Sequence, residues 1–171
     1  MILRGNRFVI VVLLTMVLGG VISGCYSFKG ISIPPDVKSY YVPVFEVRAP
    51  NAPPTVGQDF SELLKDKVRN EARLLWDEVD PDIEFTGNIA SFNVKPVAPQ
   101  PGETVALNRL EVAVAVNFVN NRDEEKNWSN RFSFFSDFGT DQNLLDIQDG
   151  LLIDIFEQIQ EDIFNKAFTD W

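Results

Sequence analysis

A strictly alternating pattern between Leu110 and Phe118 constrains the fold of this chain more than any other segment. Apolar side chains occupy every second position there, and mostly small or polar residues lie between them. A period of two predicts a strand that buries one face and exposes the other. A polar turn at 120–126 follows and an aromatic segment returns over 128–138, so we predict an antiparallel hairpin over 107–138. This sheet needs a covering layer from elsewhere in the chain.

Two segments with helical periodicity can supply that layer. The first starts at Thr55, which forms a capping-box pattern with Gln58. The second is acidic and ends near Thr169, and either Asp141 or Asn143 is its candidate N-cap. Each segment carries one apolar stripe, as amphipathic helices do. The stripes consist of Phe60, Leu63, Leu64, Val68, Ala72 and Leu75 in the first segment, and of Leu145, Leu152, Phe156, Ile159, Ile163 and Ala167 in the second.

Two further strands complete the predicted architecture. The segment 39–47 alternates and is rich in Tyr, Val and Phe, and Pro43 within it indicates an edge position or a site where no backbone donor is needed. The segment 83–94 alternates with a change of phase near Ala90, which predicts a β-bulge. The predicted order is therefore β-α-β-β-β-α. We expect an α+β two-layer sandwich, in which two helices cover one face of a four-stranded mixed sheet and the other face is open to a partner.

Composition excludes several classes of function. The chain has no histidine, which removes Ser-His-Asp catalysis and most transition-metal sites. Its net charge of −10 is a poor match for nucleic acid. Nine acids and one base, Lys166, lie between Asp137 and the C-terminus. Calcium ligation by Asp137, Asp141 and Asp146 is disfavoured because the EF-hand spacing is absent, so we interpret the acids as a solvated face. We expect no catalytic residue, no metal and no cofactor.

The N-terminus has the layout of a bacterial lipoprotein signal. Two arginines precede an uncharged apolar run at 8–18, and the string Val-Ile-Ser-Gly-Cys at 21–25 resembles a lipobox. We predict that residues 1–24 are a signal peptide and that Cys25 is lipidated and becomes the first residue of the mature chain. The lipid would then hold the protein at a membrane. Cys25 is the only cysteine, so no disulfide forms within the chain.

A membrane-spanning or core helix is the less favoured interpretation of the N-terminus. A span needs ~20 predominantly apolar residues, and Gly19, Gly20 and Gly24 weaken a helix there. Removal of residues 1–24, which hold two arginines and no acid, leaves 147 residues with a net charge of −12. Residues 25–38 are polar and contain prolines, and they predict an extended tether that leads to one domain over 39–171.

Four strings of sequence together resemble a known family. They are Cys-Tyr-Ser-Phe-Lys-Gly-Ile-Ser-Ile-Pro-Pro-Asp-Val-Lys at 25–38, Val-Pro-Val-Phe-Glu-Val-Arg-Ala-Pro at 42–50, Leu-Asn-Arg-Leu-Glu-Val at 107–112, and Glu-Asp-Ile-Phe-Asn-Lys-Ala-Phe at 161–168. In number and order they resemble the LptE-like lipopolysaccharide-assembly lipoproteins, in the form found in Bacteroidetes-type bacteria. The resemblance runs from the lipobox to the last residue, and only Cys25 carries over residue by residue.

The resemblance implies a non-enzymatic lipoprotein that is lipid-anchored at the cell outer membrane. Such a protein sits within the large β-barrel LptD as a plug, helps the barrel assemble, and binds lipopolysaccharide during its delivery to the cell surface. The expected partners are therefore an LptD-like barrel, lipopolysaccharide and the membrane. The family's fold agrees with the β-α-β-β-β-α order predicted above.

Lipopolysaccharide carries phosphates, for which Lys and Arg are the natural partners. Lys95, Arg109 and Arg131 lie in or beside the predicted sheet and are the candidate contacts. Each could instead be a solvated strand residue or pair with Glu84 or Glu111. The charge of −12 opposes lipopolysaccharide binding unless bases cluster on one face, divalent cations mediate, or the contribution is mainly to barrel assembly. The aromatic residues that could either fit a barrel lumen or pack in the core are Tyr40, Tyr41, Trp128 and Phe135.

Two other classes of function remain open. A free-standing outer-membrane lipoprotein that binds a small ligand or peptidoglycan would have a concave pocket and no barrel partner. An enzyme with paired carboxylates, as in glycosidases, is disfavoured because nothing in the sequence marks two acids held together in a pocket.

Overall fold

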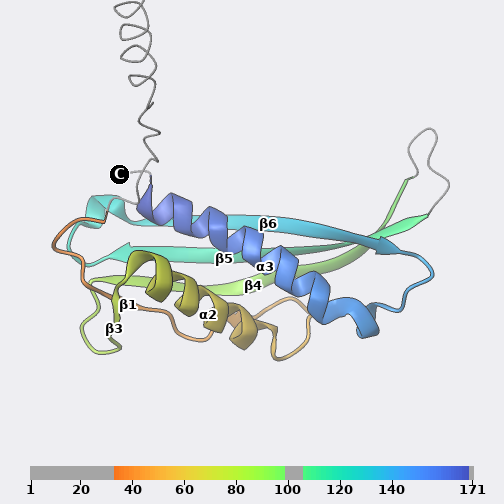
Figure 1. The fold of residues 1–171 in the computed structure, drawn as a ribbon, viewed down its shortest axis with the longest axis horizontal. Coiled ribbons are helices and arrows are strands. Elements are labelled where there is room, and N and C mark those ends of the chain that lie inside the picture. The colour runs from red at the N-terminus through yellow and green to blue at the C-terminus, as the bar shows by residue number, and fades with distance from the viewer. Residues whose placement is uncertain (1–32, 99–105, 170–171) are drawn as a thin grey trace, which may run out of the picture. The chain divides into compact units, whose positions relative to one another are not determined.

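The structure is a computed structural model that describes residues 33–98 and 106–169. The predicted signal peptide and Cys25 lie outside the described residues. Figure 1 shows a sheet with both helices on the same face. In chain order the elements are β1 (Ser39–Tyr41), β2 (Glu46–Val47), α2 (Val56–Lys67), a π-helical turn (Val68–Ala72), β3 (Leu75–Trp76), β4 (Ile83–Val97), β5 (Leu107–Asn120), a 3-10 turn (Glu124–Lys126), β6 (Trp128–Gly139) and α3 (Leu144–Phe168).

The sheet is mixed, as predicted, and has the strand order β3-β1-β4-β5-β6, with β2 also paired to β4. The strands β4, β5 and β6 form an antiparallel meander, whereas β1, β2 and β3 pair in parallel. The predicted hairpin is confirmed, since β5 and β6 pair from Leu107 opposite Gly139 to Phe118 opposite Trp128. The predicted bulge is confirmed by a shift of register between Ile89 and Ser91.

The sheet has six strands, so the predicted number of four was wrong. The segment 39–47 does not form one strand, because the chain leaves the sheet around Pro43 and the amide of Phe45 donates to Ser61 Oγ of α2 at 2.8 Å. Pro43 therefore lies between β1 and β2. At its other end β4 continues through Pro96 to Val97, although Pro96 fits a loop better by sequence.

The first helix also ends earlier than predicted. α2 stops at Lys67, the next turn widens into a π-helix, and Arg73 adopts the left-handed conformation with φ of 56°. This turn directs Leu75 away from the helix, and its amide donates to the carbonyl of Lys38 at 2.9 Å. Leu75 and Trp76 thereby add a short edge strand beside β1.

The two helix starts differ in how they are capped. Asn143 caps α3, because its Oδ1 accepts a hydrogen bond from the amide of Leu145 at 3.2 Å, as predicted. The predicted capping box of α2 was wrong, since Thr55 has helical dihedral angles and makes no side-chain cap hydrogen bond. The chain enters α2 through a turn in which the amide of Val56 donates to the carbonyl of Pro53 at 3.2 Å.

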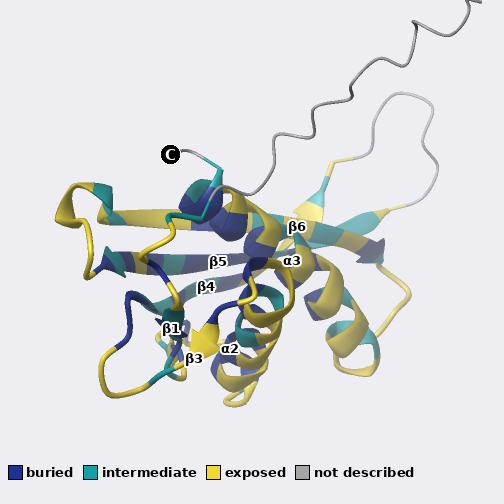
Figure 2. Ribbon diagram, turned by 60° about the vertical axis from the view of Figure 1, so that its left-hand side comes forward, coloured by how far each residue is buried: buried dark blue, intermediate teal, exposed yellow. Residues whose placement is uncertain are grey.

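The core lies between the sheet and the two helices, where Figure 2 shows the buried residues. α2 packs over β2 and β4, and α3 packs over β5 and β6. An aromatic chain connects the layers, with ring centroids 5.1 Å apart from Phe45 to Phe60 and again from Phe60 to Phe156. Lys67 Nζ joins α2 to α3 through Glu161 Oε2 at 2.6 Å.

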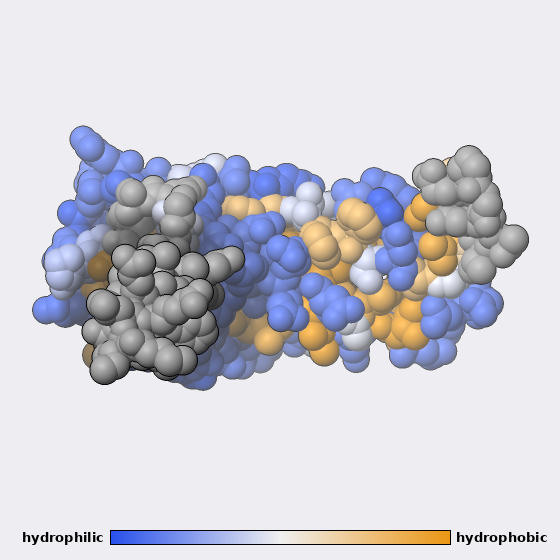
Figure 3. All heavy atoms as spheres, turned by 45° about the horizontal axis from the view of Figure 1, so that its top comes forward, coloured by the Kyte–Doolittle hydropathy of each residue, from blue (hydrophilic) through white to orange (hydrophobic). Residues whose placement is uncertain are grey.

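Large apolar side chains also reach the surface of the described residues. They include Phe135 of β6 and Leu145 and Ile153 of α3. Viewed from the β6 side, hydrophobic atoms form a band that is flanked by hydrophilic atoms (Figure 3). Within the described ranges, neither helix is both long enough and apolar enough to cross a membrane.

Candidate binding surfaces

The face of the sheet opposite the helices carries small and polar side chains. Because successive strand residues point to opposite faces, the residues that alternate with the core positions of β4, β5 and β6 share this open face. No helix of the described ranges covers it. Its central rows consist of Thr86, Asn88 and Ser91 on β4, Ala113, Ala115 and Asn117 on β5, and Ser129 and Ser133 on β6.

All three basic residues singled out from the sequence lie on this open face, but they do not form one patch. Lys95 and Arg109 are directly opposite each other across β4 and β5. Arg131 is opposite Ala115, which is six positions farther along β5 than Arg109. At ~3.3 Å per residue this separation is about 20 Å. The structure therefore brings two of the three candidates together.

The two neighbouring cations are each paired with a carboxylate. Arg109 binds Asp137 through two hydrogen bonds, of 2.7 and 2.9 Å, and its guanidinium lies 3.5 Å from the ring centroid of Phe135. Lys95 Nζ binds Glu111 Oε2 at 2.9 Å, which is one of the pairings considered from sequence. The hydrogen bonds from Arg109 hold the pKa of Asp137 below its ordinary value despite partial burial. These positive charges are thus balanced within the sheet.

Arg131 differs from the other two cations. Its Nη2 donates to Ser91 Oγ at 2.9 Å, across the strand between them. No salt bridge within the described ranges includes Arg131. Among the three candidates it is therefore the one whose charge no neighbouring carboxylate balances.

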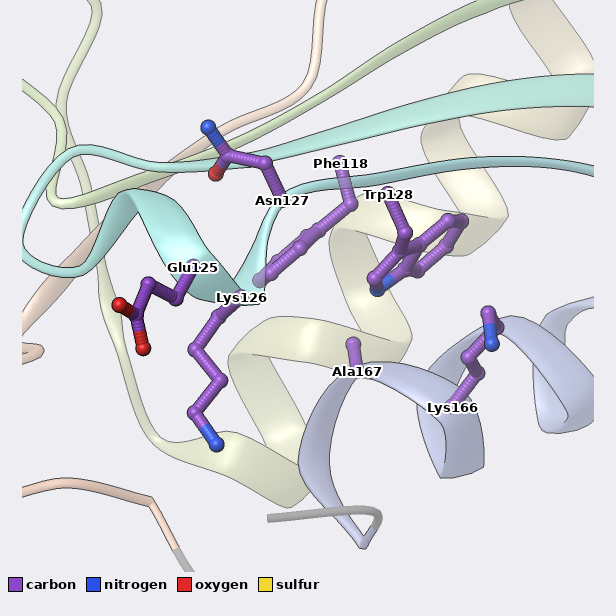
Figure 4. Close-up of a pocket in the computed structure, with 7 residues that line it drawn as sticks. All are labelled: Phe118, Glu125, Lys126, Asn127, Trp128, Lys166 and Ala167. Atoms are coloured by element: carbon purple, nitrogen blue, oxygen red, sulfur yellow. The ribbon is translucent and has the colours of Figure 1, made fainter.

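A pocket of about 280 Å³ lies at the end of the hairpin, between the β5–β6 turn and the last turns of α3 (Figure 4). Lys126 approaches it from the 3-10 turn and Lys166 from α3. Lys166 Nζ lies 5.6 Å from the ring centroid of Trp128, which stacks on Phe118 with ring centroids 5.3 Å apart. The pocket is also lined by the carboxylate of Glu125, so its two ammonium groups and one carboxylate leave it with one net positive charge. Ammonium groups beside an aromatic face suit an anionic group attached to a sugar or lipid.

Sequence reasoning missed this pocket as a site. Lys126 and Lys166 are far apart in the chain, and only the packing of α3 along the hairpin brings them to one place. A usable signal was nevertheless present, because Lys166 is the only base among the acids that follow Asp137.

The four aromatic candidates divide between core and surface. Tyr40 is buried, and its hydroxyl donates to the carbonyl of Lys65 at 3.0 Å. Burial raises the pKa of Tyr40 above its ordinary value. Tyr41 and Trp128 are partly buried, and Trp128 packs against the core. Phe135 is 42 % exposed on the open face, so it is the aromatic residue best placed to meet a partner there.

Asp82 is a buried carboxylate at the end of the sheet. Its Oδ2 accepts from the amides of Lys38 at 2.7 Å and Ser39 at 3.0 Å, and its Oδ1 accepts from Arg122 Nε at 2.5 Å. Burial raises the pKa of Asp82, but these donors outweigh burial and hold the pKa below its ordinary value. Because its oxygens are occupied, this carboxylate fixes the junction of β1, β4 and the β5–β6 turn.

Comparisons with known proteins bear on both the family and the fold. The family model described as LptE, lipopolysaccharide-assembly, matches residues 37–167. Among solved structures, a hypothetical protein from Chlamydia trachomatis is 10 % identical, with 77 % of this chain and 98 % of that chain covered and a TM-score of 0.51. This likeness supports the α+β fold.

Two further solved structures are similar at lower scores. Lipoprotein B from Nitrosomonas europaea is 15 % identical, with 79 % of this chain and 84 % of that chain covered and a TM-score of 0.49. A minor lipoprotein from Acinetobacter baumannii is 8 % identical, with 75 % and 88 % covered and a TM-score of 0.47. No curated protein matches the chain by sequence.

Proposed function

The chain belongs to the LptE family of non-enzymatic lipopolysaccharide-assembly lipoproteins, and from this premise we propose that it is a lipid-anchored plug of an LptD-type barrel. In this proposal Cys25 carries the lipid after removal of residues 1–24, and the domain sits in the lumen of the barrel at the outer membrane. There it assists assembly of the barrel and contacts lipopolysaccharide during delivery.

The open face of the sheet is the observation that carries the proposal. The lumen of an outer-membrane barrel is polar, so a plug needs a polar surface. The open face meets this need because it carries small polar side chains and because Lys95 and Arg109 are paired with carboxylates. Such a surface can enter a lumen without bringing unpaired cations, apart from Arg131, against the barrel wall.

The proposed lipid anchor is compatible with where the domain begins. Val37 is buried and the amide of Lys38 is held by Asp82, so the end of the predicted tether is packed on the domain. Ile33 also packs against the core. Residues 33–38 therefore belong to the domain, and we propose that the lipid on Cys25 keeps the domain close to the membrane surface.

We propose that two features contact lipopolysaccharide. Arg131 is available to a phosphate because no carboxylate binds it in the described ranges. The pocket with Lys126 and Lys166 offers ammonium groups beside an aromatic ring. A phosphate could bind Lys95 or Arg109 only by displacing the carboxylate of Glu111 or Asp137, so these two residues are weaker candidates for the contact.

Purification from detergent-solubilised outer membrane tests the barrel partnership. We expect the tagged full chain to recover one large β-barrel protein, and a photo-crosslinking residue in place of Asn117, exposed on the open face, to attach to that protein. Recovery of the chain alone, without a cross-link, would overturn the proposal. If the chain then bound a small ligand or peptidoglycan, the free-standing alternative would replace it.

Lipopolysaccharide capture tests the two contact features separately. We expect Arg131→Glu and Lys166→Glu each to lower capture by the purified full chain severalfold. Arg69→Glu is the matched control, because it makes the same charge change at an exposed residue of the α2 side that is paired with Asp66. Equal loss in all three variants would mean that only net charge acts, and no loss would remove both features from the proposal.

A further inference from the structure

Strand β6 is a long free edge of the sheet within the described residues. It has 12 residues, pairs only with β5, and shows no shift of register along that pairing. Natural sheets protect such edges with proline, lysine, bulges or short strands. β6 contains neither proline nor lysine, whereas the opposite edge strand, β3, has only two residues. The β6 edge therefore lacks the usual protection against strand addition.

The two charged residues of β6 do not guard the edge either. Arg131 reaches back across the sheet to Ser91 of β4, and Asp137 binds Arg109 of β5. Both side chains are thus directed over the open face. The edge itself is left with serine, asparagine and aromatic side chains.

The backbone groups that face outward can be assigned. The amide of Thr140 donates to the carbonyl of Ala106 at 3.3 Å, directly across the end of the β5–β6 ladder. The amide of the preceding residue, Gly139, points away from β5 and donates to Gln142 Oε1 at 2.9 Å. Because antiparallel strands bond at alternate positions, the odd-numbered residues of β6 direct their N–H and C=O groups outward. These residues are Ser129, Arg131, Ser133, Phe135 and Asp137.

An acidic groove of about 240 Å³ runs beside this edge, between β6 and α3. It is lined by Phe134, Asp154, Glu157, Gln158 and Glu161, with no base among them. Glu161 is paired with Lys67, whereas Asp154 and Glu157 are exposed and enter no salt bridge within the described ranges. On this side of the molecule, Figure 3 shows hydrophobic atoms with hydrophilic atoms along their sides. A segment seated on the edge would therefore meet aromatic rings on one side and carboxylates on the other.

Charge decides which occupant fits. A second copy that paired its own β6 in a two-fold arrangement would bring two acidic α3 flanks together, and like charges oppose that pairing. A strand with Lys or Arg at alternate positions would satisfy the outward backbone groups and the carboxylates of Asp154 and Glu157 at once.

We infer that the β6 edge binds an extended segment of a partner polypeptide by strand addition, with basic side chains of that segment facing the acidic flank of α3. The inference concerns a polypeptide partner and depends on neither a barrel nor lipopolysaccharide. It would stand if the proposed function failed.

Binding of a synthetic ten-residue peptide with alternating lysine and threonine tests the inference on the full chain. The matched peptide replaces each lysine with glutamate, and a third carries N-methyl groups on alternate backbone amides. We expect only the first to bind, and we expect its binding to slow hydrogen exchange at the amides of Ser129, Arg131 and Ser133. Equal binding of the lysine and glutamate peptides, or no binding, would overturn the inference.

Variants of the protein separate the backbone contribution from the charge contribution. Ser133→Pro removes one outward N–H and leaves the hydrogen bonds between β5 and β6 intact. Edge strands tolerate proline at such positions, where the N–H faces away from the sheet. We expect Ser133→Pro to weaken binding of the lysine peptide at least tenfold, whereas Ser133→Ala leaves binding unchanged. If Ser133→Pro fails to fold, the exchange measurement on the unmodified chain decides. Unchanged binding in a folded Ser133→Pro would contradict strand addition.

The charge contribution has its own matched control. Asp154→Lys with Glu157→Lys should weaken binding of the lysine peptide at least tenfold. Asp59→Lys with Glu62→Lys makes the same change of net charge on α2 and should alter binding less than twofold. Equal effects of the two pairs would show that net charge alone acts. Self-association that protects the same β6 amides without peptide would assign the edge to a second copy.

Discussion

At the scale of single residues, a few buried polar atoms determine how the short strands meet the long ones. The Asp82 carboxylate accepts hydrogen bonds from the amides of Lys38 and Ser39, at the start of β1, and from the side chain of Arg122. In return, Ser39 Oγ accepts from the amide of Asp82 at 3.0 Å. An asparagine side chain keeps one acceptor oxygen but puts an NH2 group in place of the other, so some of these donors lose their buried acceptor, which costs about 1–3 kcal/mol.

We therefore predict that Asp82→Asn lowers the free energy of unfolding by about 2 kcal/mol at pH 7. A carboxyl whose pKa is lower in the folded than in the unfolded state stabilises the fold above its unfolded pKa, and the contribution is lost as pH falls through the folded pKa. The difference between the two proteins should thus shrink below about pH 4. Urea unfolding at pH 7 and pH 3 measures it, and a difference independent of pH would contradict this account.

Gly57 allows α2 to approach the chain between β1 and β2. A Cβ atom at this position would lie 2.1 Å from the carbonyl oxygen of Phe45. Gly57→Ala should therefore lower the free energy of unfolding by about 1–3 kcal/mol, although helix propensity alone predicts a gain. Gly150→Ala in α3 is the control, because a Cβ there meets nothing within 4 Å, and it should stabilise by about 0.5–1 kcal/mol. Urea unfolding that gave both changes the same sign would refute this explanation.

Residue roles were predictable from sequence only in part. Alternation places Lys95 and Glu111 on the strand face opposite the core, but their ion pair also needs the register of β4 against β5. The binding of Asp137 by Arg109 depends on the register between β5 and β6, and the meeting of Lys126 with Lys166 depends on where α3 ends. Those contacts are set by tertiary packing, which local patterns do not contain.

At the scale of elements, the long strands and α3 were predictable because each repeats its pattern over many residues. The short strands β2 and β3 were not, since two residues carry no period. Their pairing depends on distant partners, as when the amide of Leu75 donates to the carbonyl of Lys38. The π-helical turn and the left-handed Arg73 likewise have no local signal, because arginine rarely takes that conformation.

The two helix starts give an element-level prediction. Asn143→Ala should lower the free energy of unfolding by about 1 kcal/mol, because it removes the acceptor for the amide of Leu145. Thr55→Ala should change it by less than about 0.5 kcal/mol, since Thr55 makes no side-chain cap. Urea unfolding of both variants checks this contrast. Equal losses would show that Thr55 caps α2 in solution.

At the scale of the whole molecule, the fold presents three different surfaces in its described part. The helix layer is acidic, the open sheet face is polar with Lys95 and Arg109 paired to carboxylates and Arg131 bound to Ser91, and the β6 edge offers unpaired backbone groups. This division explains how a chain of net charge −10 can serve in lipopolysaccharide assembly. The two helices hold nine acids and three bases, a net charge of −6, whereas ion pairs make the surface proposed to meet the barrel close to neutral.

Depletion of the protein in its own cells tests the central claim most directly. The account predicts that lipopolysaccharide accumulates short of the cell surface and that the amount of correctly folded LptD-type barrel falls at the same time. Surface labelling of lipopolysaccharide and heat-modifiability of the barrel on gels measure the two quantities in one culture. Normal surface lipopolysaccharide together with a normally folded barrel after depletion would contradict the account.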